Sequence, residues 1–173
     1  PRFEYNGIGY RQYWANNLQN KFYDPEFSAN TTGIYLGDGT GPIYTYNAGF
    51  VTNDLDMWVN TGYNTFVNSR SEGAIKHINS DAGSVAAGPN FIINPILINN
   101  GGGVSRVSAY DNLIVRLGAG PLTVIGGTIG FYSVNNPAFI SNSVSPMTLI
   151  GVFLNNTNIG ISSDMNTYNT KIT

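Results

Sequence analysis

The run Leu122-Thr123-Val124-Ile125-Gly126-Gly127 returns 25 positions later as Met147-Thr148-Leu149-Ile150-Gly151-Val152. Each copy is a short apolar and β-branched run that reaches a glycine, and such runs between turn residues are typical of β-strands. A recurrence of this length fits one coil of a solenoid, in which each coil stacks its inward side chains on its neighbour. The echo therefore predicts a repeating β structure.

Other short runs support the same structure. The run Phe91–Asn100 and the run Val152–Asn156 both close on an Asn pair, and strands are also expected at Asn112–Leu117 and Ala138–Ser141. Their apolar residues would form an interior ladder, while Gly and Asn suit corners because they tolerate positive φ. We predict an all-β, right-handed parallel β-helix. The alternative is an antiparallel β-sandwich or jelly roll, which also has short strands between regular turns.

Residues 1–60 differ from the rest in their many Tyr and Trp residues. Tyr10, Tyr13, Trp14 and Leu18 follow mixed i+3 and i+4 spacing, which predicts a helix over Gly9–Lys21. We therefore expect an N-terminal capping segment with a short helix over 1–60 and solenoid coils over 61–173, the whole being one compact unit and a fragment of a longer chain.

Composition narrows the possible partners. Charged residues are 10% of the chain, and the 24 Asn and 21 Gly residues make up about a quarter of it. Lys and Arg do not cluster, so nucleic acid is not a predicted partner. No apolar run approaches the length of a membrane span. Without Cys, disulfides and thiolate metal sites are excluded, so stability has to come from packing or oligomerisation.

The phrases Pro121–Gly127 and Ser145–Gly151 resemble coils of the pectate-lyase-like β-helices in bacteriophage tailspikes. The resemblance spans about residues 85–160 and rests on apolar triplets, Gly corners and Asn-rich turns. It implies a homotrimeric, extracellular protein of the phage tail that binds, and often cleaves, a bacterial surface polysaccharide during host attachment. No metal or cofactor is expected.

Asp54 and Asp56 are candidate catalytic carboxylates. In an extended run they share a face with Cα atoms about 6.5 Å apart, and carboxyl separations of about 6.5–9.5 Å suit an inverting glycosidase. Trp58 or Tyr63 nearby would stack on a sugar ring. The alternative is that both carboxylates lie in turns or on the solvent face, with Trp58 in the core.

A second charged cluster begins at Arg70 and includes Glu72. Glu72 is a candidate general acid or base, with Arg70 as a ligand-binding partner, and a lyase could use such a cluster to remove a proton beside a uronate carboxylate. The alternative is an exposed, salt-linked rung.

These patterns lead to three functional hypotheses. The leading one is a virion-associated tailspike or tail-fibre fragment that recognises a bacterial surface polysaccharide. The second is a polysaccharide depolymerase, either glycosidase or lyase, that uses Asp54, Asp56 or Glu72. The third is a structural or carbohydrate-binding jelly roll.

Overall fold

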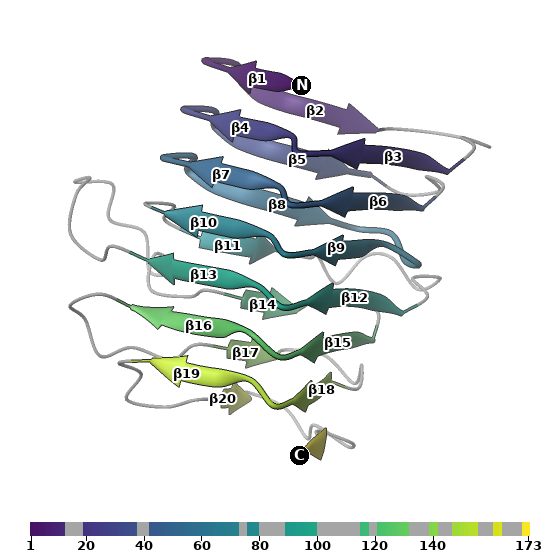
Figure 1. Ribbon diagram of the computed structural model, residues 1–173, viewed down its shortest axis with the longest axis vertical. Coiled ribbons are helices and arrows are strands. Elements are labelled where there is room, and N and C mark those ends of the chain that lie inside the picture. Colours follow the sequence, from purple (N-terminus) through teal and green to yellow (C-terminus); the bar gives the residue numbers. More distant parts are fainter. Residues whose placement is uncertain are drawn as a thin grey trace.

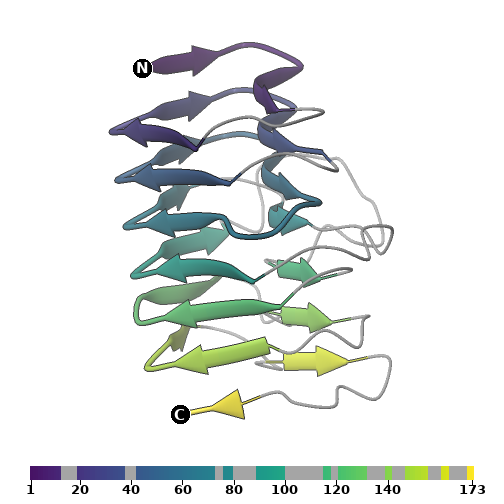
Figure 2. The same cartoon turned by 90° about the vertical axis from the view of Figure 1, so that its right-hand side faces the viewer.

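The chain winds as a coil of short strands through three parallel β-sheets in the computed structural model (Figure 1). The structure describes residues 1–12, 19–37, 42–72, 76–79, 89–99, 115–117, 121–131, 139–141, 147–155, 161–163 and 171–173. Each sheet contains seven strands within these residues, and the chain passes through sheet A, sheet B and sheet C in that order. Figure 2 shows the resulting stack of coils from the side.

Sheet A consists of β1 (Arg2–Glu4), β4 (Glu26–Ser28), β7 (Gly49–Val51), β10 (Arg70–Glu72), β13 (Ile96–Asn99), β16 (Thr128–Phe131) and β19 (Phe153–Asn155). Sheet B consists of β2 (Ile8–Gln12), β5 (Thr32–Leu36), β8 (Leu55–Val59), β11 (Lys76–Asn79), β14 (Val115–Leu117), β17 (Phe139–Ser141) and β20 (Ile161–Ser163). Sheet C consists of β3 (Asn20–Tyr23), β6 (Ile43–Tyr46), β9 (Thr65–Val67), β12 (Asn90–Ile93), β15 (Leu122–Ile125), β18 (Met147–Ile150) and β21 (Lys171–Ile172).

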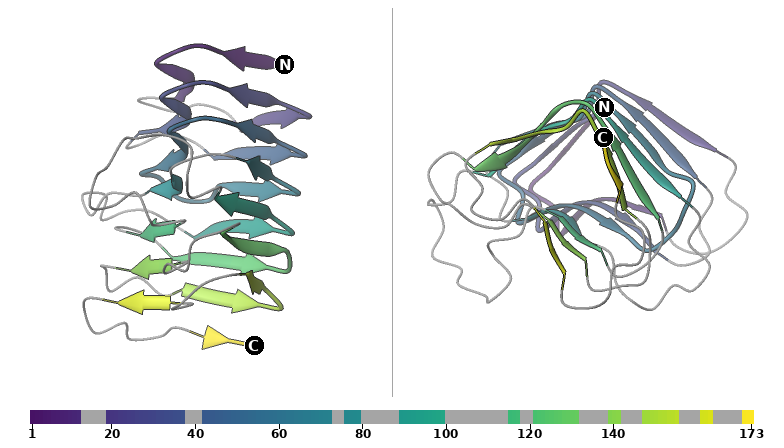
Figure 3. Two further views of the ribbon diagram at one scale, coloured as in Figure 1. Left: turned by 90° about the vertical axis from the view of Figure 1, so that its left-hand side faces the viewer. Right: turned by 90° about the horizontal axis from the view of Figure 1, so that it is seen from below.

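The prediction of a right-handed parallel β-helix is confirmed. In Figure 1 the chain descends from the N-terminus while sheets C and A run from right to left in front and sheet B returns behind them, which is a right-handed path. Viewed along its axis the coil is roughly triangular (Figure 3). Among the described strands every pairing is parallel, for example β2 with β5 and β15 with β18. This excludes the antiparallel sandwich or jelly roll.

The 25-residue sequence repeat corresponds to one coil of the solenoid. Strand β15 pairs with β18 in the register Leu122↔Met147, so each residue of the first copy lies beside its counterpart in the second. Leu122 and Val124 point inward and are buried, as are Met147 and Leu149 in the next coil. The repeat in sequence is therefore a repeat of core positions.

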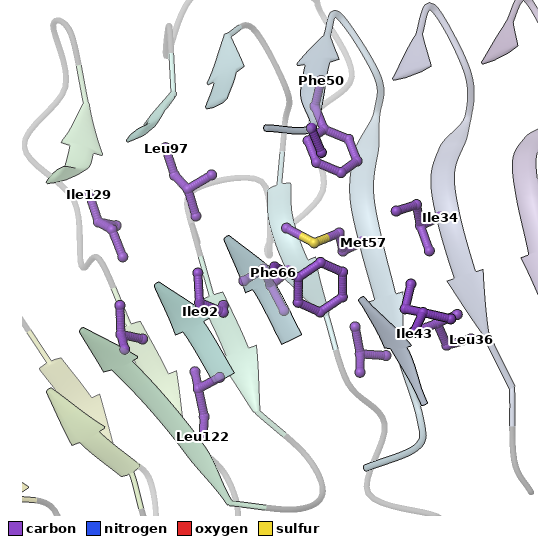
Figure 4. Packing of buried hydrophobic residues seen from close by; sticks show 14 of the residues in the cluster. Ile34, Leu36, Ile43, Phe50, Met57, Phe66, Ile92, Leu97, Leu122 and Ile129 are labelled. Atoms are coloured by element: carbon purple, nitrogen blue, oxygen red, sulfur yellow. The ribbon is translucent and has the colours of Figure 1, made fainter. Parts of the chain in front are cut away.

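The core is a continuous column of buried apolar side chains inside the three sheets (Figure 4). In sheet A one column runs Phe3, Phe27, Phe50, Ser71, Leu97, Ile129 and Leu154, each paired in register with the next. The rings of Phe27 and Phe50 stack with centroids 5.2 Å apart. Parallel in-register strands bring equivalent side chains together at every coil, which gives the core its ladder form.

The corner between sheets C and A explains the predicted Gly and Asn positions. The first corner residue has positive φ in six successive coils, and these residues are Asp24, Asn47, Asn68, Asn94, Gly126 and Gly151. Asp and Asn tolerate this conformation better than most side chains, and Gly adopts it without a Cβ penalty. At Gly127, a Cβ would lie 2.2 Å from the carbonyl oxygen of Pro95, so the second corner residue of that coil has to be Gly.

Two ladders of buried Asn side chains satisfy backbone groups at the other corners. Between sheets A and B, Asn30 and Asn53 are almost fully buried and continue from the exposed Asn6. Between sheets B and C, Asn64 donates from Nδ2 to Asn90 Oδ1 at 2.8 Å. Buried backbone groups need such partners because water cannot reach them.

The predicted helix over Gly9–Lys21 is wrong where the structure describes it. Residues up to Gln12 belong to β2, and β3 begins at Asn20, while residues 13–18 lie outside the described part. Strand β2 pairs in register with β5, so Arg11 faces Tyr35. The strands of residues 2–59 take their places in the same three sheets as the later ones. Backbone pairing with the next coil outweighs the helix-like spacing of the aromatic residues.

Aromatic side chains from the first coil gather at the N-terminal end of the core. Phe3 in β1, Tyr10 in β2 and Phe22 in β3 are half-buried and contact one another edge to face, with centroids 4.8–6.5 Å apart. Phe3 also stacks on Phe27 of the next coil. Burial raises the pKa of the Tyr10 hydroxyl, and a hydrogen bond from Asn20 acts in the opposite direction. The first coil thus covers the apolar column with rings.

Candidate functional site

A row of flat side chains crosses three coils on the outer face of sheet B. Tyr35 lies between the buried Ile34 and Leu36, and Trp58 lies between the buried Met57 and Val59. Because side chains alternate along a strand, both rings point away from the core. We call Arg11, Tyr35 and Trp58 the sheet B aromatic row.

The members of this row are in contact. Strand register places Arg11 beside Tyr35 and Tyr35 beside Trp58. The Arg11 guanidinium carbon is 5.4 Å from the centre of the Tyr35 ring, within the range of a cation–π interaction. The Tyr35 and Trp58 rings are tilted by 39° with centroids 5.8 Å apart. In backbone register the row continues to Asn79 and Arg116.

The accessible part of Trp58 is its ring surface. Its Nε1 is buried and has no hydrogen-bond partner among the residues that the structure describes, although the side chain as a whole is only half-buried. A ligand on the outer face of sheet B would therefore meet the ring, which offers an apolar surface for C–H groups.

A second pair of aromatic side chains lies on the outer face of sheet C. The rings of Tyr23 and Tyr46 are nearly parallel, with an interplanar angle of 9° and centroids 5.0 Å apart. Tyr23 is 61% exposed. This tyrosine pair is a second surface on which a planar or apolar ligand could stack, and it belongs to a different sheet from Trp58.

The structure places the predicted carboxylate Asp56 inside the solenoid. Its exposed fraction is 0%, and its two oxygens accept hydrogen bonds from Asn53 Nδ2, at 3.1 Å, and from the hydroxyl of Ser71. Asp54 precedes β8 and is half-buried. A polysaccharide cannot reach a carboxylate enclosed in the core, whereas part of the Trp58 side chain is accessible.

The position of Asp56 depends on the size of the sheet A residue that enters the core from the next coil. A Cβ on Gly9 would lie 2.8 Å from the carbonyl oxygen of Gly33, and a Cβ on Gly33 would lie 2.8 Å from that of Asp56. The same Cβ atoms would lie 3.2 Å from the rings of Phe27 and Phe50, so the close backbone and the Phe of the following coil together favour Gly at these positions. One coil later the entering residue is Ser71, which is small, and Asp56 takes the space and accepts its hydroxyl hydrogen bond.

Glu72 and Arg70 lie on the outer face of sheet A. They flank the buried Ser71 in β10, and Arg70 forms an ion pair with Glu72 at 2.5 Å. The Arg70 side chain is 68% exposed and the Glu72 side chain is 44% exposed. The pair thus has the geometry of an exposed, salt-linked rung, and sheet A separates Glu72 from Asp56.

Tyr63 lies in the corner that follows β8, where it has a φ of 67°. Its side chain is 62% exposed. The structure thus keeps Trp58 and Tyr63 in the same coil, on its outside, whereas the three predicted carboxylates are separated between the core, a corner and sheet A.

Arg11 and Tyr35 were not predicted as site residues. Arg11 lies within the segment expected to form a helix. The signal that would have found them is the spacing of Asn6, Asn30 and Asn53, at 24 and 23 positions. It extends the coil repeat through residues 1–60 and places Arg11, Tyr35 and Trp58 at equivalent positions.

Comparison with protein families, curated proteins and solved structures finds no match for this chain. In the described part of the structure, no helix is long and apolar enough to cross a membrane. The same residues contain no group of three or more His, Cys, Asp or Glu side chains placed to hold a metal ion.

Proposed function

We propose that this chain is a glycan-binding β-solenoid that recognises a bacterial surface polysaccharide as part of a bacteriophage tailspike or tail fibre. The observation that carries the proposal is the sheet B aromatic row, in which Arg11, Tyr35 and Trp58 form one surface across three coils. The tailspike-like coils at 121–127 and 145–151 support an extracellular, virion-attached setting.

The chemistry of the row suits a sugar. The faces of Tyr35 and Trp58 provide apolar surface for the C–H groups of a pyranose ring. Stacking also aligns the ligand without a large desolvation cost, because the sugar keeps its outer hydroxyls in water.

The geometry favours binding over cleavage. Glycoside hydrolysis needs two carboxyl groups on either side of the scissile bond. Asp56 is enclosed in the core, and Glu72 is paired with Arg70 on another sheet. A depolymerase that uses the predicted carboxylates is therefore the less supported alternative, and release of new reducing ends from a bound polysaccharide would revive it.

Replacing Trp58 by Ala should weaken polysaccharide binding about tenfold, or ~1.4 kcal/mol, because the stacking surface is lost. Trp58→Phe should bind with intermediate affinity, since it keeps a smaller aromatic face. Isothermal titration against purified bacterial capsule or O-antigen fragments measures both effects, once thermal melting has shown that the variants fold.

Tyr23→Ala on sheet C is the matched control for this experiment, and its affinity should equal that of the parent chain. Loss of binding in Tyr23→Ala with unchanged binding in Trp58→Ala would place the site on sheet C instead. Failure of the parent chain to bind any member of a panel of surface polysaccharides would contradict the proposal itself.

A homotrimer is the second part of the proposal. Exposed apolar side chains gather near the corner between sheets C and A in the later coils, and they are Ile96, Ile125, Ile150 and Phe153. Ile125 and Ile150 are register partners, and Phe153 is 62% exposed. Contiguous exposed apolar residues are typical of surfaces that another chain covers.

Multi-angle light scattering should give a mass three times the 18.7 kDa of one chain. Changing both Ile150 and Phe153 to Ser should lower this mass to that of a monomer, because the change removes apolar contact area from each copy. The thermal stability of the resulting monomer is the control for folding. A monomeric parent chain at all concentrations tested would exclude the trimer and leave the glycan site unaffected.

A further inference from the structure

The Asn ladder between sheets A and B has one member that differs from the others. Asn6 is exposed and is followed by Gly7, whereas Asn30 and Asn53 are 2% and 1% exposed and are followed by Thr31 and Asp54. These three Asn residues occupy equivalent corner positions in successive coils. Their reactivity can therefore be compared on a common backbone.

We propose that Asn6 is a site of spontaneous deamidation that yields aspartate and isoaspartate, and that isoaspartate at this position loosens the first coil. In this reaction the backbone nitrogen of Gly7 attacks Cγ of Asn6, and the side-chain nitrogen leaves as ammonia. Water then opens the cyclic imide at one of its two carbonyls, which gives aspartate or, with the main chain rerouted through Cγ, isoaspartate.

The surroundings of Gly7 favour the attack. A Cβ placed on Gly7 would meet no atom within 4 Å, so this side of the Gly7 backbone is open. Gly is also the residue with the greatest backbone freedom, which helps the nitrogen to reach the Asn6 side chain. At Asn30 and Asn53 the next residue has a side chain, and the corner is enclosed.

The Asn6 side chain is also held by fewer hydrogen bonds than those of Asn30 and Asn53. The Asn6 side chain makes one bond, from Nδ2 to the Glu4 carbonyl at 2.9 Å. The Asn30 side chain accepts from Asn6 N and donates to Phe3 O and Asn53 Oδ1. The Asn53 side chain takes part in four such bonds. Only Asn6 can rotate into the reactive geometry without breaking a buried network.

Isoaspartate at position 6 would disturb the corner because it adds a methylene group to the backbone. The carbonyl of Asn6 accepts from Thr31 N at 3.2 Å, and the carbonyl of Gly7 accepts from Thr32 N at 2.9 Å. A longer backbone between β1 and β2 cannot keep both bonds together with the register of Phe3 on Phe27. The first coil should therefore open locally while the later coils stay paired.

The test is to incubate the intact chain at mildly alkaline pH and then to map its tryptic peptides by mass spectrometry. Asn6 lies in the peptide 3–11, whereas Asn30 and Asn53 lie in the peptide 22–70. We expect deamidation in the peptide 3–11, with isoaspartate among its products, and none at Asn30 or Asn53. The other Asn-Gly step, Asn100-Gly101, falls in the separate peptide 77–106.

Two variants make the test specific. Gly7→Ala should slow the loss of Asn6 several-fold, and the open space around this residue allows the methyl group. Asn6→Asp adds the charge without lengthening the backbone, so it should keep the hydrogen-exchange protection of residues 2–12 that the isoaspartate form loses. Retention of Asn6 under conditions that deamidate an unfolded peptide of residues 3–11, or equal deamidation at Asn30 and Asn53, would overturn the proposal.

Discussion

Ser71→Phe should lower the free energy of unfolding by roughly 4 kcal/mol, the largest single-residue effect that we expect in this chain. The new ring would enter the space that Asp56 occupies in the core, and it would remove the hydroxyl that donates to the Asp56 carboxylate. Overpacking and the loss of a partner for a buried carboxylate act together at this site.

The double variant with Ser71→Phe and Asp56→Gly should recover at least half of that loss. It recreates the arrangement of the preceding coil, in which the ring of Phe50 lies against Gly33. Asp56→Gly alone should also destabilise, by about 2 kcal/mol, because Ser71 and Asn53 each lose a buried partner. Denaturant unfolding of the four proteins in the cycle gives the coupling energy, which we expect to exceed about 2 kcal/mol.

The control for added volume is Val51→Phe, which enlarges an exposed residue on the outer side of β7 and should change stability by less than about 0.5 kcal/mol. Any other contact of Asp56 is lost in both proteins that lack its side chain, so it cancels in the cycle. Additive effects of the two core substitutions would show that Phe and Gly are not matched across sheets A and B.

Asn53→Ala should cost about 3 kcal/mol, because it leaves several buried groups without partners at once. The Oδ1 atom of Asn53 accepts from the backbone nitrogen of Asn30 at 2.9 Å, and its Nδ2 donates to the Phe27 carbonyl at 2.9 Å and to Asp56. These groups lie in the core, where no water replaces the missing bonds. Chemical unfolding measures the loss, and faster hydrogen exchange at the Asn30 amide locates it.

Asn68→Gly is the comparison at an exposed corner, where Asn47, Asn68 and Asn94 are linked by side-chain hydrogen bonds between sheets C and A. Asn68 donates to Asn47 Oδ1 and accepts from Asn94, both at 3.1 Å, but water can replace these bonds. Gly also tolerates the positive φ of this position, so the change should stay within about 0.5 kcal/mol. If Asn53→Ala were as mild as Asn68→Gly, the buried ladder would not be a main source of stability in this Cys-free chain.

The coil repeat, the parallel stacking and the Gly and Asn corners were predictable from the sequence because they depend on residues that recur at a fixed distance. Leu122 and Met147 are 25 positions apart and become register partners, and Gly126 and Gly151 become corner residues with positive φ. Local properties suffice here, since a short β-branched run favours a strand and a Gly favours a corner wherever the coil begins.

The helix expected from Gly9, at the residues that the structure describes, and the surface position expected for Asp56 were wrong, because both depend on neighbours from other coils. The spacing of Tyr10 and its aromatic neighbours resembles a helix until β5 supplies hydrogen-bonding partners for β2. Asp56 is buried because Ser71, 15 positions later in sequence, leaves room in the core and donates a hydrogen bond.

The candidate glycan site likewise combines features that the sequence predicts with features that depend on neighbouring coils. The sequence by itself determined that the chain coils and where the later coils repeat, and it identified Trp58 and Tyr63 only as candidates for stacking. Only the tertiary structure decided that Arg11, Tyr35 and Trp58 form one row while Asp56 and Glu72 are kept apart. The physical reason is that the register between coils, and the volume of the residue in the next coil, determine which side chains meet.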